Sequence, residues 1–236
     1  MVDLGKYYNR RVHELGHGSH LLQVGHSING SAISQLDVDV IINDITNGLS
    51  LNKNDSLLDL CCGNGAITHK LSKTCRNIVA IDLSKELISI AKKQFSAENI
   101  IYEHRDVYSL TKQFGHSLNI NKVLMFAALQ HFKKNDLADL LLLIFSICGS
   151  DTRIFFGFVT DNSYKWKFHN SPKKKILYYT RRLLKYDKMG TWWQKDYIAE
   201  VCHSLNLTCT FQSVLKGCYG YPYRFHCTIQ KEEGLS

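Results

Sequence analysis

The feature that most constrains this chain is an apolar run that leads directly into a glycine-rich turn. Residues 57–66 read LLDLCCGNGA, and a helical pattern follows from Ala66 to Lys73. Glycine lets a backbone approach a ligand closely and supplies positive φ angles, and the following helix offers free N–H groups in its first turn. Strand, turn and helix in this order form the ligand-binding unit of dinucleotide-type α/β folds. We therefore expect a ligand site at this turn.

Strand and helix patterns alternate through most of the chain. Short β-rich runs fall at 56–60, 77–81, 99–104, 122–126 and 152–159, with helical patterns such as 84–95 and 135–148 between them. Parallel strands need such crossovers, and the helices then cover both faces of the sheet. After a helix at 193–205, runs at 207–214 and 223–230 are predicted to pair as an antiparallel hairpin. The predicted fold class is α/β, with a Rossmann-like, doubly wound, mostly parallel seven-stranded sheet and an antiparallel C-terminal strand.

Three aspartates follow successive predicted strands. Asp59 belongs to the spacing D-x-C-x-G-x-G, which differs from the G-x-G-x-x-G of pyrophosphate binders and suits the amino group of an amino-acid moiety. Asp82 ends the second strand, where an acid accepts hydrogen bonds from ribose hydroxyls, and Ser84 is the expected cap of the next helix. Asp106 follows the third strand and is placed to accept from an adenine amino group.

Together these segments resemble the class I S-adenosylmethionine-dependent methyltransferases. The glycine motif of that family resembles LDLCCGNG at 58–65, its ribose motif VAIDLS at 79–84, and its adenine motif HRDVYSL at 104–110. VLMFAALQHF at 123–132 looks like the family's fourth strand and the turn beside the methyl group. The resemblance covers roughly residues 50–160. It departs from the usual motif at Cys61, where most members have a glycine and several small-molecule branches have another small residue.

The resemblance implies a methyltransferase enzyme with S-adenosylmethionine as its cofactor. By the same resemblance, Asp59, Gly63 and Gly65 hold the methionine end, Asp82 the ribose, and Asp106 with Val107 the adenine. Further cofactor contacts are expected from Cys61, Asn64, Leu83 and Phe126. Residues 22–34 resemble the N-terminal segment of bacterial methyltransferases found with polysaccharide or small-metabolite genes, a segment that folds over the bound cofactor.

A single domain of 236 residues is expected, with four parts. These are a helical N-terminal cap at 1–50, a cofactor-binding core at 51–160, a lid insertion over the acceptor at 161–195, and a C-terminal helix and hairpin at 196–236. Within the cap, residues 36–49 have helical spacing, and Gly48 falls where a C-terminal helix cap is expected.

The charge of the chain points to an anionic acceptor. The formal net charge is +8, and residues 164–188 are dense in Lys and Arg with interleaved aromatic residues. Such a segment binds nucleic acid, anionic lipid headgroups or a phosphorylated small molecule, or it is simply a solvated helix. We expect a small phosphorylated or sugar-linked acceptor, with His26, Tyr178, Arg181 and Arg182 as its contacts.

Methyl transfer is an in-line displacement, so the protein mainly supplies proximity and orientation. An oxygen or nitrogen acceptor also needs a base, and His131, just after the fourth strand, is the predicted catalytic residue. His17, His20 and His26 are further candidates.

Two other functions stay open. The charge favours an RNA or tRNA methyltransferase, although no RNA-binding module is recognised. A non-catalytic partner subunit would keep the fold without the reaction.

The eight cysteines are predicted to be reduced thiols, and no metal site is predicted. The polar residues 1–11 and the lack of eighteen consecutive apolar residues lead us to expect a cytoplasmic protein without a membrane partner.

Overall fold

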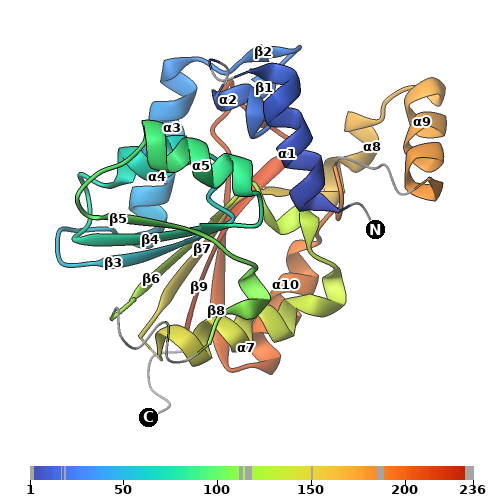
Figure 1. Cartoon of the computed structure of the whole chain (residues 1–236). Helices are drawn as coiled ribbons and strands as arrows, with labels where there is room; N and C mark the ends of the chain where they lie inside the picture. The colour runs from blue at the N-terminus through green and yellow to red at the C-terminus, as the bar shows by residue number, and fades with distance from the viewer. Residues whose placement is uncertain are drawn as a thin grey trace.

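The computed structural model describes residues 3–16, 18, 20–111, 114, 119–149, 151–184 and 189–231. Its centre is a seven-stranded sheet in the order β5-β4-β3-β6-β7-β9-β8 (Figure 1). The strands are β3 (Ser56–Leu60), β4 (Asn77–Asp82), β5 (Ile100–His104), β6 (Lys122–Phe126), β7 (Arg153–Thr160), β8 (Leu207–Ser213) and β9 (Arg224–Lys231). Strands β3 to β7 pair in parallel, and β9 is antiparallel to both of its neighbours. The predicted sheet and its reversed C-terminal strand are confirmed.

Helices cover both faces of this sheet. One face carries α3 (Gln35–Leu49), α4 (Ala66–Leu71) and α5 (Lys85–Gln94), and the other carries α7 (Leu137–Cys148) and α10 (Lys195–Ser204) (Figure 1). Alternate residues of each strand point to opposite faces, so Leu57 joins one core while Leu58 and Leu60 join the other. Because helices cover both faces, every residue of β3 is buried, and three of its five residues are leucines.

The N-terminal segment lies over the carboxyl end of the sheet. It contains α1 (Leu4–Leu15), α2 (His20–Gln23) and a small hairpin of β1 (Ser27–Ile28) and β2 (Ser31–Ala32). The Arg11 guanidinium donates to the carbonyls of Leu22 and Gln23, which holds α2 against α1. The Ser84 hydroxyl, which caps α5 as predicted, donates to Asn9 and ties α1 to the sheet domain.

Short helices connect the remaining elements. They are η1 (Val107–Ser109), η2 (Leu129–His131), η3 (Lys134–Asp136), η4 (Asn162–Tyr164) and α8 (Lys165–Phe168), and the longer helix α9 (Pro172–Leu183) follows α8. Helices α8 and α9 project from the body in Figure 1. Within the described residues, no helix combines the length and the apolar character needed to cross a membrane.

Gly48 serves a packing role, and the expectation that it caps its helix is wrong. Helix α3 continues to Leu49, and Ser50 takes the left-handed conformation at its end. A Cβ atom on Gly48 would lie 2.2 Å from Cε2 of Phe155 on β7. The glycine therefore lets α3 lie close against the centre of the sheet.

We expect Gly48→Ala to destabilise the protein. Overpacking costs about 1–3 kcal/mol and should outweigh the gain in helix propensity, which is at most ~1 kcal/mol. Asn43→Ala, at an exposed position of the same helix, is the matched control and should change the stability by less than about 0.5 kcal/mol. Thermal unfolding of both variants measures the difference. Equal midpoints for Gly48→Ala and the unaltered protein would show that α3 shifts away from Phe155 at no cost.

Candidate cofactor and acceptor site

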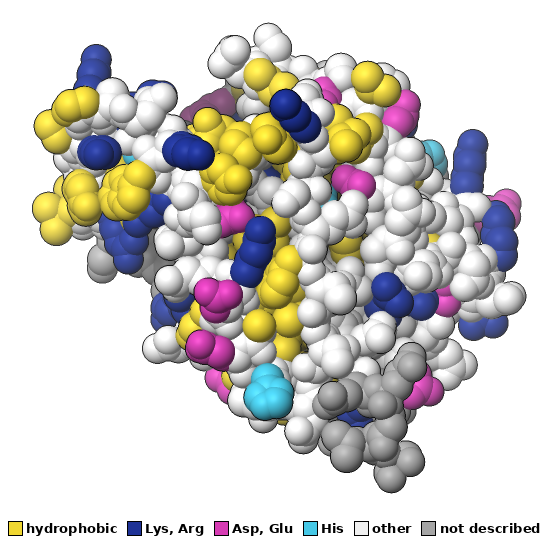
Figure 2. All heavy atoms as spheres, turned by 180° about the vertical axis from the view of Figure 1, so that it is seen from behind, with side chains coloured by type: hydrophobic (Ala, Val, Ile, Leu, Met, Phe, Trp, Pro, Cys, Tyr) yellow, Lys and Arg dark blue, Asp and Glu magenta, His cyan; other side chains and the backbone are white. Residues whose placement is uncertain are grey.

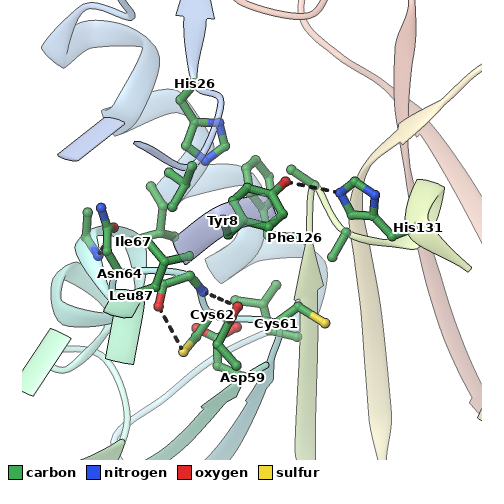
Figure 3. Close-up of a pocket in the computed structure, with 17 residues that line it drawn as sticks. Tyr8, His26, Asp59, Cys61, Cys62, Asn64, Ile67, Leu87, Phe126 and His131 are labelled. Atoms are coloured by element: carbon green, nitrogen blue, oxygen red, sulfur yellow. Dashed lines mark hydrogen bonds between the residues drawn. The ribbon is translucent and has the colours of Figure 1, made fainter. Parts of the chain in front are cut away.

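A pocket opens at the carboxyl ends of β3, β4 and β6, beneath the N-terminal segment (Figure 3). The structure brings most of the predicted site residues into its lining: Asp59, Cys61, Gly63, Asn64, Asp82, Phe126, His26 and His131. The carboxyl ends of neighbouring parallel strands meet at one sheet edge, which is where such folds bind ligands. Asp59 and Asp82, from two of the predicted strand ends, therefore share one connected pocket, and Asp106 lies outside its lining.

The turn after β3 has the backbone that its glycines permit. Cys61, Gly63 and Gly65 all have positive φ, at 60°, 60° and 79°. A Cβ on Gly65 would lie 2.7 Å from the Tyr102 hydroxyl, and a Cβ on Gly63 would lie 2.7 Å from Cγ1 of Val24. Both glycines are thus also required by the protein's own packing, Gly65 against β5 and Gly63 beneath the N-terminal segment.

Two carboxylates face the pocket, the buried Asp59 and the half-buried Asp82. Asp59 is 3% exposed and accepts a hydrogen bond from the Thr68 hydroxyl at 2.7 Å. Burial raises the pKa of Asp59 to about 7, although the Thr68 hydrogen bond lowers it, and the charge of Asp82 adds to the rise. Within the described part of the chain Asp59 forms no ion pair. A bound cationic group would therefore balance the negative charge of this carboxylate.

Asp82 has a second role that was not expected. Its carboxylate accepts from the Gly63 N–H at 2.9 Å and from the Ser84 N–H at 2.8 Å, so it holds the glycine turn in place. Burial raises the pKa of Asp82, and these two N–H donors oppose the rise. Each carboxylate oxygen accepts one of these bonds and keeps a further lone pair for a ribose hydroxyl.

Four predicted cofactor residues lie outside the pocket lining: Gly65, Leu83, Asp106 and Val107. Asp106 is exposed at the end of β5, and its carboxylate accepts from the Tyr108 N–H at the start of η1. Because β3, β4 and β5 are adjacent, Asp59, Asp82 and Asp106 follow one another along the sheet edge. That order suits an elongated ligand with an amino-acid end, a ribose and an adenine.

The N-terminal segment closes one side of the pocket. The Asn64 amide donates to the His20 carbonyl at 2.8 Å and to Oε1 of Gln23 at 2.9 Å. These two hydrogen bonds fix α2 on the glycine turn. The His20 ring packs edge-on against Phe95 at 4.9 Å between ring centres, and His17 lies outside the described residues.

His131 lies opposite the glycine turn and contacts a residue that sequence reasoning missed. Its Nε2 is 3.2 Å from the hydroxyl of Tyr8 on α1, and both side chains line the pocket (Figure 3). Burial, with a smaller contribution from the charge of Arg224, lowers the pKa of His131 to about 4. Burial also raises the pKa of Tyr8. At neutral pH the imidazole is therefore neutral and the phenol keeps its proton.

Arg224 is a second residue that the sequence did not indicate. Its guanidinium donates to Oε1 of Gln130 at 3.1 Å and to the Phe158 carbonyl at 2.9 Å. Burial lowers the pKa of Arg224 to about 10, so it stays charged at neutral pH. Its charge lies close enough to lower the pKa of both His131 and His26, and burial, the larger cause, brings His26 to about 4.

None of the described residues of the insertion at 161–195 lines this pocket. Tyr178 is buried inside the insertion, and its hydroxyl accepts a hydrogen bond from Nη1 of Arg182 at 2.7 Å. Arg181 is exposed, and neither arginine lines the pocket. Residues 185–188 of the insertion are outside the described residues.

The sheet order, with its reversed strand β9, is the fold of the class I S-adenosylmethionine-dependent methyltransferases. Residues 57–149 match the family model described as a methyltransferase domain. An S-adenosylmethionine-dependent methyltransferase from Anabaena variabilis superposes with a TM-score of 0.68 at 18% identity, over 98% of this chain and 96% of that chain. Magnesium protoporphyrin IX methyltransferase from Synechocystis, with bound S-adenosylhomocysteine, gives 0.65 at 14% identity, over 97% and 98%. The chain therefore has the fold of these methyltransferases, and residues 57–149 are similar to a methyltransferase domain.

The similarity to curated relatives is confined to part of their length. Ribosomal RNA small subunit methyltransferase A of Mycoplasma mobile is 30% identical over 97 residues, which are 41% of this chain and 36% of that protein. The chain thus spans well under half of the length of the curated relatives that it matches.

Proposed function

We propose that this chain transfers the methyl group of S-adenosylmethionine to an oxygen or nitrogen of a small anionic acceptor. The observation that carries the proposal is the position of the Tyr8–His131 pair, which lines the same pocket as Asp59 and Asp82. One side of the pocket thus suits a cofactor with a cationic amino group, and the other side offers a proton acceptor. When bound, the cofactor supplies a methyl group activated by a positively charged sulfur.

The cofactor side is formed by the turn after β3 and the next two strand ends. Asp59 would pair with the amino group of the methionine moiety, and Asp82 would accept from the ribose hydroxyls. Asp106 and Val107, at the end of β5, would meet the adenine. These residues bind and orient, and the N-terminal segment over them excludes water.

On the acceptor side we propose that Tyr8 and His131 move one proton. In the tautomer of His131 that carries its proton on Nδ1, the Tyr8 hydroxyl donates to Nε2 and can accept a hydrogen bond from the acceptor. As the acceptor atom attacks, its proton passes to the Tyr8 oxygen, and the Tyr8 proton passes to His131. Tyr8 is unchanged at the end of the step, and His131 carries the proton.

The charge of Arg224 supports an anionic acceptor. This guanidinium lies near His26 and His131, which occupy the acceptor side of the pocket, and the described structure gives it carbonyl and amide oxygens rather than a carboxylate as hydrogen-bond acceptors. Arg181 and Arg182 would take part only with an acceptor long enough to reach beyond the pocket.

Calorimetry and a transfer assay together test the proposed function. We expect S-adenosylmethionine and S-adenosylhomocysteine to bind with micromolar affinity, about −8 kcal/mol. Labelled methyl groups should then appear in an anionic fraction of a small-metabolite extract. No heat and no thermal shift with either cofactor would refute the proposal.

The same assay separates the alternatives. The similarity to the Mycoplasma mobile relative and the positive charge of the chain favour RNA methylation as an alternative. That alternative predicts label in an RNA fraction. A partner subunit without its own activity predicts cofactor binding with no label in any fraction.

A further inference from the structure

The outer face of α9 carries apolar side chains that no other part of the described structure covers. Ile176, Tyr179 and Leu183 are spaced three and four residues apart and are 66%, 58% and 84% exposed. This spacing places them on one ridge of the helix. Leu184, directly after the helix, is 62% exposed. Figure 2 shows hydrophobic and basic side chains together on the lobe at its upper left.

The inner face of α9 is fixed, so the helix cannot turn its apolar ridge inward. Tyr178 is buried, with its ring centre 4.7 Å from that of His169 and 5.8 Å from that of Trp166. His169 in turn packs against Trp192, which precedes α10. The exposed ridge is therefore a stable feature of the surface.

The segment that carries the ridge has positively charged residues and no negatively charged ones. Residues 164–184 contain seven Lys and Arg and no Asp or Glu. Lys173, Lys174 and Lys175 lie in the first turn of α9, where the helix dipole favours anions and disfavours cations. An external anionic surface would relieve this local repulsion.

We infer that α8 and α9 dock this chain onto an anionic lipid membrane surface. An amphipathic helix with a basic flank, an apolar ridge and a neighbouring tryptophan is the form of element that lies in the membrane interface. RNA would use the positive charge but would leave Ile176, Leu183 and Leu184 exposed to water. The inference does not depend on methyl transfer, and it departs from our expectation of no membrane partner while involving no spanning helix.

Vesicle sedimentation of the full chain tests the inference. We expect binding to vesicles of phosphatidylcholine mixed with phosphatidylglycerol and at least tenfold weaker binding to phosphatidylcholine alone. Lys173→Gln with Lys174→Gln should weaken binding roughly fivefold for each charge removed. Ile176→Ser with Leu183→Ser should weaken it about tenfold or more.

Matched controls lie on other helices of the same chain. Leu36→Ser on α3 removes an equally exposed leucine, and Lys92→Gln with Lys93→Gln on α5 removes two exposed lysines. Neither control should change vesicle binding. Thermal unfolding should show that all of these surface variants remain folded.

The chain also carries its own fluorescent reporter. Of its three tryptophans, Trp166 is 44% exposed beside α9, whereas Trp192 and Trp193 are 4% and 0% exposed. Anionic vesicles should shift the tryptophan emission to shorter wavelength, and Trp166→Phe should abolish the shift. The inference is overturned if the chain ignores anionic vesicles, binds neutral ones equally well, or loses binding equally in the controls. Tight, salt-sensitive binding of single-stranded RNA without vesicle binding would also overturn it, in favour of an RNA surface.

Discussion

Asp59→Asn is expected to weaken S-adenosylmethionine binding about tenfold to a hundredfold while making the free protein more stable above neutral pH. The loss corresponds to about 1–3 kcal/mol, the usual contribution of a hydrogen bond to a charged group. The gain in stability has the opposite cause. The carboxylate is buried without an ion pair in the described structure, so the neutral amide removes a buried charge while its oxygen still accepts from Thr68.

The pH dependence follows from the raised pKa of Asp59. The pKa of about 7 in the folded protein exceeds the ordinary aspartate value of 3.8, so the folded state favours the protonated form. This group therefore stabilises the free protein at low pH, and that contribution is lost as the pH rises from about 4 to about 7. A cationic amino group prefers the ionised form, so cofactor affinity should increase between about pH 6 and pH 8.

Calorimetry and thermal unfolding at several pH values measure both effects. The asparagine variant should show weak cofactor binding that hardly changes with pH. Thr68→Val is the matched control, because losing its hydrogen bond raises the pKa of Asp59 further and shifts the rise in affinity to higher pH. If Asp59→Asn binds as tightly as the unaltered protein at pH 8, Asp59 does not hold the amino group.

His131→Ala should reduce turnover by about a hundredfold to ten-thousandfold, the range typical of a lost general base. Cofactor affinity should change little, because the cofactor side of the pocket is built from the ends of β3 and β4. Tyr8→Phe should have a similar effect on turnover, since it removes the hydroxyl that links the acceptor to His131. The double variant should be scarcely slower than either single variant, because both remove the same proton path.

The pH profile and the double-mutant cycle distinguish this role from simple packing. With the pKa of His131 near 4, turnover should rise with pH through about 4 to 5 and then stay flat across neutral pH, unless Asp59 limits cofactor binding. Saturating cofactor removes that second dependence. Strictly additive losses in the cycle, or full turnover in Tyr8→Phe, would exclude the relay and leave the pair a packing contact.

The sequence by itself determined the features that depend on neighbouring residues. Alternating strand and helix patterns predicted the order of elements, and the turn after Asp59 predicted where the ligand site begins. Parallel strands bring their carboxyl ends to one edge, so Asp59, Asp82 and Asp106 could be placed together without coordinates. The order of elements is confirmed, because periodicity, glycine turns and strand ends are local signals, and the ligand contacts of the three acids stay predictions.

The tertiary structure alone decided which distant residues complete the site. Tyr8 and His131 are 123 positions apart and meet only because α1 folds over the sheet edge. Arg224 is a single cation at the start of a strand, with no pattern to distinguish it from a surface residue. The same holds for Gly48, whose role depends on the ring of Phe155 in another element. Side chains that meet across the fold have no characteristic spacing in the sequence, because their contact depends on how whole helices pack against the sheet.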